Sequence, residues 1–198
     1  MNSIVEILVV LAVGVLLIAL VKTILDVFVS RMPGNSLTST GSHGVVSNAF
    51  PAVDKYAAWD NKLQQMERRM LELTNLERIR HPIESRGAKA LLWHEEAAQV
   101  ARHYCLDQAT RGFFSHYSPE GEDAAARLTK AGIYFTAVAE NLARGYPSVE
   151  ATTAAFMDEP RFQANHRGAI LCPQFTHAGV GVIPDPRGGL VVVQLFLR

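Results

Sequence analysis

The sequence predicts an α+β domain preceded by one transmembrane helix. Residues 4–20 are apolar apart from Glu6, and a membrane-spanning helix needs roughly 20 mostly apolar residues. From about residue 59, apolar side chains recur at helical intervals of three and four. From residue 178 the chain instead has two apolar runs joined by a Pro/Gly turn, which is typical of a β-hairpin. Helices followed by an antiparallel hairpin indicate the α+β class.

Residues 1–30 are predicted to be a retained membrane anchor. The apolar face continues past Lys22, so residues 4–29 would contact membrane lipid, with Glu6 and Lys22 near the two interfaces. The alternative is a cleaved signal peptide, which usually carries cations before its apolar run. Residues 1–3 carry no charged side chain. Lys22 and Arg31 follow the span, and the positive-inside rule alone would keep that side cytoplasmic.

Residues 31–58 are predicted to be a linker, because residues 33–42 are rich in Gly, Ser and Thr and cannot bury enough apolar surface to fold alone. The chain has 198 residues, with 19 Lys+Arg and 19 Asp+Glu. It therefore lacks the basic excess of a nucleic-acid-binding protein, and no nucleic-acid partner is expected.

The domain proper is expected to cover residues 59–198, and its first helix begins near Trp59 and ends near Arg80. Asp60 or Asn61 can cap its start, and Pro82 disfavours helical geometry at the residue before it. Further helices are expected over residues 91–109, 123–130 and 148–158, followed by strands over residues 178–183 and 190–197.

Cys105 and Cys172 are the only cysteines, and their spacing matches no zinc motif. They could be buried free thiols, or they could form a disulfide between a helix and a later strand in an oxidising compartment. A disulfide depends on the separation of the two Cα atoms, so the spacing leaves both alternatives open.

Short motifs follow one another through the domain in a fixed order: LTNLER at 73–78, LW at 92–93, FSH at 114–116, AG at 131–132, ENLA at 140–143, HR at 166–167, FT at 175–176, GVG at 179–181 and QLF at 194–196. This succession resembles the bacterial branch of the CAP superfamily (cysteine-rich secretory, antigen 5 and pathogenesis-related proteins). The resemblance implies a three-layer α-β-α sandwich with a central antiparallel sheet. It also implies a periplasmic domain on a single-pass protein of the bacterial cytoplasmic membrane, opposite to the bias of Lys22 and Arg31.

The resemblance further implies a cleft lined by two histidines and two glutamates, which match His116, Glu140, Glu159 and His166. Phe156 stands where the family usually has Trp. Residues 158–166 read DEPRFQANH, a longer segment than the usual Ser-Pro-Gly-His-Arg, and this insertion would reshape one wall of the cleft.

Two histidines and two carboxylates could bind a divalent metal such as Zn or Ca, act as a general acid and base, or hold the fold together by hydrogen bonds. A hydrolase would also need a nucleophile. Ser115 adjoins His116, but neighbouring residues of an extended segment point apart, and the chain has no G-x-S-x-G motif. No catalytic residue is therefore firmly assigned, and a non-enzymatic role is preferred.

Two functions follow from these observations. In the first, the domain is an interaction or structural module that docks on other membrane-protein subunits, for example as an accessory subunit of a photosynthetic or respiratory complex. The alternative is a metal-binding or metal-dependent, hydrolase-like site at His116, Glu140, Glu159 and His166.

Overall fold

The computed structural model describes residues 61–198, so the predicted anchor (1–30) and linker (31–58) lie outside the described residues. Within the described part of the chain, none of the helices is both long and apolar enough to cross a bilayer.

A four-stranded sheet in the order β1-β3-β4-β2 forms the middle of the domain. Its strands are β1 (Leu92–Trp93), β2 (Val138–Tyr146), β3 (His177–Pro184) and β4 (Leu190–Leu197). The hairpin of β3 and β4 matches the prediction, and Gly188 N–H donates to the Asp185 carbonyl in its turn. Every residue of β4 is buried, because this strand has neighbours on both edges and helices on both faces.

The resemblance implied an antiparallel sheet, but the sheet is mixed. The pairs β2–β4 and β3–β4 are antiparallel, but β1 runs parallel to β3. The helix predicted over residues 91–109 is wrong at its start, because β1 occupies Leu92–Trp93. Leu92 N–H and His94 N–H donate to carbonyls of Thr176 and Ala178, so this stretch is a strand, and the helix starts after it.

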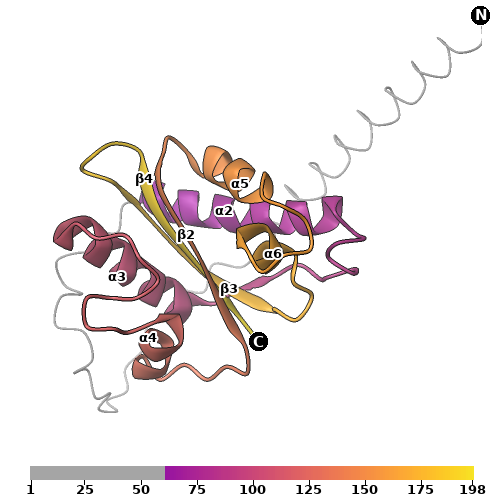
Figure 1. The fold of residues 1–198 in the computed structure, drawn as a ribbon, viewed down its shortest axis with the longest axis horizontal. Helices are drawn as coiled ribbons and strands as arrows, with labels where there is room; N and C mark the ends of the chain where they lie inside the picture. Colours follow the sequence, from indigo (N-terminus) through magenta and orange to yellow (C-terminus); the bar gives the residue numbers. More distant parts are fainter. Residues whose placement is uncertain (1–60) are drawn as a thin grey trace, which may run out of the picture. The chain divides into compact units, whose positions relative to one another are not determined.

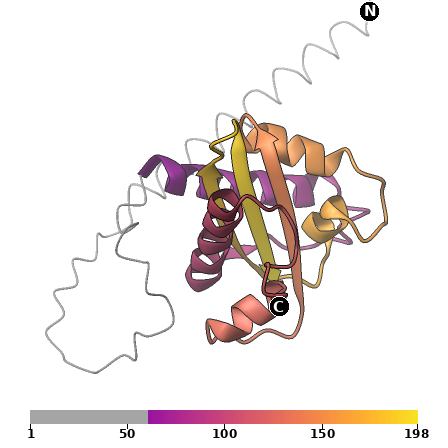
Figure 2. The ribbon, with the colours of Figure 1, turned by 60° about the vertical axis from the view of Figure 1, so that its left-hand side comes forward.

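Helices cover both faces of the sheet and make three layers (Figures 1 and 2). On one face lie α2 (Asn61–Arg80), α5 (Val149–Met157) and α6 (His166–Leu171); on the other lie α3 (Glu95–Arg111) and α4 (Ala124–Lys130). Each face has its own apolar core. The three-layer α+β arrangement thus agrees with the sequence prediction.

The helix ends follow local capping chemistry. Asp123 and Ser148 accept hydrogen bonds from the first turns of α4 and α5, as expected of N-caps. His94 is the N-cap of α3, a role that its residue type does not suggest. The sequence did not predict β2 or α6, because β2 carries polar residues within its run and α6 is only 6 residues long.

Two glycines explain how α3 lies so close to the sheet. A Cβ at Gly179 would stand 2.3 Å from the Ala98 nitrogen, and one at Gly181 would stand 2.5 Å from backbone atoms of α3. The Gly-Val-Gly motif of β3 therefore leaves room for direct contact between the backbones of the strand and the helix.

The two cysteines are free and lie on opposite faces of the sheet. Cys105 belongs to the core under α3, whereas Cys172 packs against the core under α2, α5 and α6. The sheet separates them, and a disulfide needs Cα atoms within about 7 Å. The structure therefore contradicts the disulfide and supports free thiols, and burial raises the pKa of the Cys105 thiol.

Candidate functional site

His116, Glu140, Glu159 and His166 come from four separate segments and line one open hollow of about 580 Å³. His116 lies in the loop after α3, and Glu140 is on β2. Glu159 follows α5, and His166 is the first residue of α6. The side chains meet as two carboxylate–histidine pairs, one on each side of the hollow.

The first pair is His116 with Glu140, whose Nδ1 and Oε1 atoms are 2.8 Å apart. Arg127 of α4 bonds the other oxygen of Glu140 and also donates to the Glu122 carbonyl. The Arg127 guanidinium lies 3.3 Å from the ring centroid of Tyr104. Burial raises the pKa of Tyr104 to about 12, so this phenol stays a neutral donor, and it bonds the Ser115 carbonyl. Glu140 is thus a buried carboxylate held by a cation and an imidazole.

The second pair is His166 with Glu159. Nδ1 of His166 is 2.5 Å from one carboxylate oxygen, and the backbone N–H of His166 donates to the other at 2.8 Å. The ring of Phe156 stacks on His166 at 4.6 Å between centroids, so Phe takes the place of the Trp that the resemblance led us to expect. Glu159 thereby satisfies an otherwise unpaired donor at the start of α6.

The unusual segment 158–166 forms one wall of the hollow, which is lined by Gln163, Ala164 and Asn165 as well as by the second pair. Asn165 caps α6 by accepting from Gly168 N–H. A Cβ at Gly168 would stand 2.0 Å from the Gln163 carbonyl oxygen, so the wall packs directly on the α6 backbone. The longer segment therefore builds the site instead of displacing Glu159 from it.

A buried polar chain holds His166 in place; its three members lie in the motifs given above, but the sequence did not indicate that they bond one another. The Asn141 amide donates to the His166 carbonyl and to Gln194, and the Gln194 amide donates to the Thr74 hydroxyl. These side chains are fully enclosed, where an unmade hydrogen bond is costly. Polar residues in the middle of apolar strands were the available signal: Asn141 interrupts β2 and Gln194 interrupts β4.

The hollow lacks the parts of a nucleophilic enzyme. Cys172 is the only hydroxyl or thiol among its lining residues, and no hydrogen bond joins it to either imidazole. Ser115 is not part of the lining, and its hydroxyl accepts from Tyr117 N–H. Imidazoles and carboxylates, the groups that general acid–base chemistry uses, line the hollow, but no activated nucleophile accompanies them among its described lining residues.

The four residues also do not fit a four-ligand metal site. Each imidazole Nδ1 faces a carboxylate, and the second oxygen of Glu140 faces Arg127. Within residues 61–198 no three His, Cys, Asp or Glu side chains are grouped so that they could hold a metal ion. As placed, the four side chains do not form a four-ligand site, and the Zn or Ca site considered from the sequence stays a prediction.

Comparisons with known proteins agree with this fold. The family model described as the cysteine-rich secretory protein family matches residues 71–196. The Bacillus subtilis protein YkwD is 31% identical over 131 residues, which are 66% of this chain and 46% of YkwD. The Bacillus subtilis membrane protein YlbC is 30% identical over 124 residues, which are 63% of this chain and 33% of YlbC.

Among solved structures, an extracellular Bacillus anthracis protein with an SCP domain superimposes with a TM-score of 0.59 and 28% identity, covering 70% of this chain and 43% of that one. The chain spans less than half the length of either Bacillus subtilis relative. The family match extends across the sheet and all four cleft residues, and the chain belongs to the cysteine-rich secretory protein (CAP) family.

Proposed function

We propose that this protein is a membrane-anchored, extracytoplasmic CAP module that works by binding other membrane-protein subunits and not by catalysis. The observation that carries the proposal is the state of the cleft: its carboxylates and imidazoles are joined in two internal pairs. No nucleophile is bonded to either pair. Such an arrangement makes a stable, shaped surface more readily than a reacting centre.

The relatives support the location. The Bacillus anthracis protein is described as extracellular, and YlbC is described as a membrane protein. The apolar run over residues 4–29 supports attachment by a single span. With the domain on the outer side of a cytoplasmic membrane, its partners would be other subunits exposed there, and an accessory subunit of a photosynthetic or respiratory complex is one such case.

The test is extraction of native membranes in a mild detergent, followed by purification of the full chain and mass spectrometry of the proteins that travel with it. Stoichiometric recovery with a larger complex is expected. Deleting residues 4–29 should release the protein from the membrane fraction, because the span is the proposed attachment.

The control is the double variant His116→Ala/His166→Ala, which opens the pairs and leaves the anchor intact. It should stay in the membrane fraction. Recovery of the unmodified chain as a free monomer would contradict the accessory-subunit role. Recovery of the deletion variant with the membranes would contradict the anchor.

A further inference from the structure

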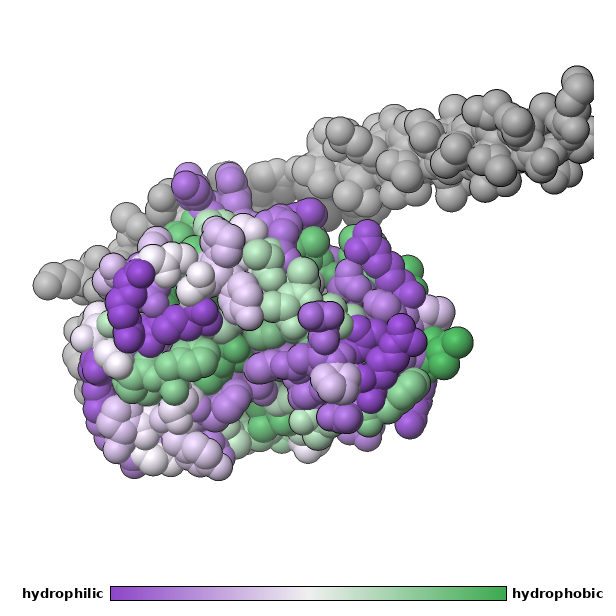
Figure 3. Space-filling model, turned by 45° about the horizontal axis from the view of Figure 1, so that its top comes forward, coloured by the Kyte–Doolittle hydropathy of each residue, from purple (hydrophilic) through white to green (hydrophobic). Residues whose placement is uncertain are grey.

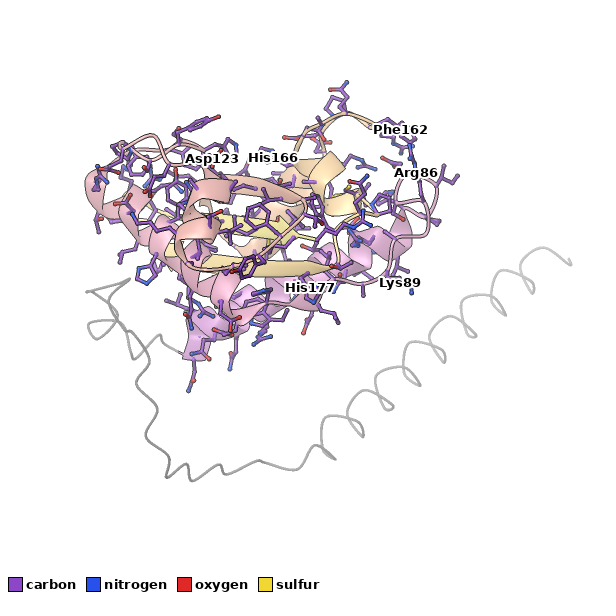
Figure 4. The ribbon with its side chains drawn as sticks, turned by 90° about the horizontal axis from the view of Figure 1, so that it is seen from below. Arg86, Lys89, Asp123, Phe162, His166 and His177 are labelled. Atoms are coloured by element: carbon purple, nitrogen blue, oxygen red, sulfur yellow. The ribbon has the colours of Figure 1, made fainter. Side chains whose placement is uncertain are left out.

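At one end of the domain, three exposed apolar side chains lie beside three exposed cations. The apolar residues are Ile79, Ile83 and Phe162, and the cations are Arg86, Lys89 and Arg161. We call these six residues the basic tip. Figure 4 shows Arg86, Lys89 and Phe162 along a single edge of the domain.

Specific contacts join the two segments that build the basic tip. Arg78 donates to the Lys89 carbonyl and its own carbonyl accepts from Ser85, so residues 81–89 fold back over the end of α2. Glu84 of this first segment pairs with Arg161, in the loop after α5, and with Arg167 of α6, which together form the second segment. Arg86 and Phe162 line the same hollow of about 310 Å³. The tip is therefore one surface, although its residues are far apart in the sequence.

At the basic tip the acidic side chains are largely buried and the cationic side chains are exposed. The acids Glu77 and Glu84 are only 13% and 8% exposed, and both are paired with arginines. The cations lie outside, and in the part of the chain that the structure describes neither Arg86 nor Lys89 has an ion-pair partner. Asp158 is the one exposed acid in the loops 81–90 and 158–165. A chain of zero net charge thus presents a positive end.

The three apolar side chains of the basic tip are all largely exposed. Ile83 is 83% exposed, and hydrophobic atoms protrude from hydrophilic surroundings at the right-hand end of Figure 3. A protein interface would be expected to have a contiguous apolar centre with few charges. Exposed aliphatic and aromatic side chains set among exposed cations instead suit the headgroup region of an anionic bilayer.

The backbone supports a binding role at the same place. Among the described residues, Arg86 (φ 51°) and Phe162 (φ 58°) are the only non-glycine residues with positive φ. Such strained positions concentrate where side chains must be presented to a ligand, and here both present a tip side chain.

We propose that the basic tip rests on an anionic lipid surface, with Arg86, Lys89 and Arg161 at the phosphates and Ile79, Ile83 and Phe162 among the upper acyl chains. This contact orients the domain on the membrane and is separate from the predicted span, since all six residues belong to the described domain. Contact between the tip and the bilayer is expected to depend on lipid charge and to weaken as salt screens it.

The test uses the full chain with vesicles of phosphatidylcholine alone and of phosphatidylcholine mixed with phosphatidylglycerol, and measures hydrogen exchange by mass spectrometry. Residues 76–92 and 158–165 should exchange more slowly only on the mixed vesicles. Replacing Arg86→Gln and Lys89→Gln should reduce the protected population about fivefold for each cation removed. Ile83→Ser should reduce it too, and its exposed position leaves the fold intact.

The matched control is the double variant Lys130→Gln/Tyr134→Ser. It removes an exposed cation and an exposed aromatic residue from α4 and the loop that follows it, and it should keep full protection. Equal protection on both kinds of vesicle, no protection on either, or unchanged protection in the Arg86/Lys89 variant would overturn the proposal. Protection that appears only in native membranes would point to a protein partner and would overturn it as well.

Discussion

The two sides of the cleft contain the same pair of residue types but support them differently. Glu140 lies on a strand, is 4% exposed and is held by the buried Arg127. Glu159 lies in a loop, is 28% exposed and bonds only the imidazole and the N–H of His166. Glu140 is thus enclosed by the fold although its partner His116 is 52% exposed, whereas Glu159 belongs to a loop that closes on the start of α6.

This difference shows how one cleft can combine a fixed wall with an adjustable one. Buried ion pairs are costly to break because the remaining charge is stranded, while partly exposed pairs contribute little since water can replace either partner. We therefore expect the Glu140 side to set the stability of the domain and the Glu159 side to set the shape of the cleft.

The largest expected effect comes from the matched variants Glu140→Gln and Glu159→Gln. Glu140→Gln strands the Arg127 guanidinium and should lower the free energy of unfolding by about 3–5 kcal/mol. Glu159→Gln should cost about 0–1 kcal/mol, because its site is partly open to water. Denaturant unfolding of both variants measures the difference, and equal losses would show that the two sides are not distinct.

A smaller effect is expected from Gly168→Ala, which acts on the loop side alone. The new methyl group would meet the Gln163 carbonyl oxygen, so the wall must move away from α6, at a cost of about 1–3 kcal/mol. Hydrogen exchange should accelerate over residues 158–166 and stay unchanged over β2. Faster exchange over β2 as well would mean that the two walls are mechanically coupled.

The smallest effect appears only in acid and concerns Glu84, which braces Arg167 of α6. The hydrogen bond from Arg167 holds the pKa of Glu84 below its ordinary value of 4.5. Since the folded-state pKa is the lower one, Glu84 stabilises the fold fully above pH 4.5, and this contribution is lost as the pH falls through the depressed value.

Unfolding measured across this acid range should therefore show a loss of stability that is shallower in Glu84→Gln. An identical slope in the variant would assign the acid sensitivity to other carboxyl groups, such as Asp185, whose pKa is also lowered, by a hydrogen bond from the Arg187 backbone and by Arg144.

The sequence by itself was enough for the α+β class, the β3–β4 hairpin, the C-terminal end of α2 and both ends of α4 and α5, because period, capping residues and turn residues act over a few neighbours. The motif order also identified the four cleft residues. Strand pairing between residues far apart in the sequence could not be predicted from such local patterns. The local pattern around residue 92 favoured a helix. β1 forms there instead because the N–H groups of Leu92 and His94 donate to carbonyls at the start of β3, more than 80 residues later.

Tertiary structure also decided which partners the cleft residues bond. Residue identity allowed metal binding, acid–base chemistry or structural pairing, and only the fold placed Arg127 against Glu140 and Glu159 at the start of α6. It separated Cys105 from Cys172 by a sheet and gathered the basic tip from two distant loops. Short-range propensities act within one turn or one strand, whereas charge pairing and burial depend on which segments the sheet brings together.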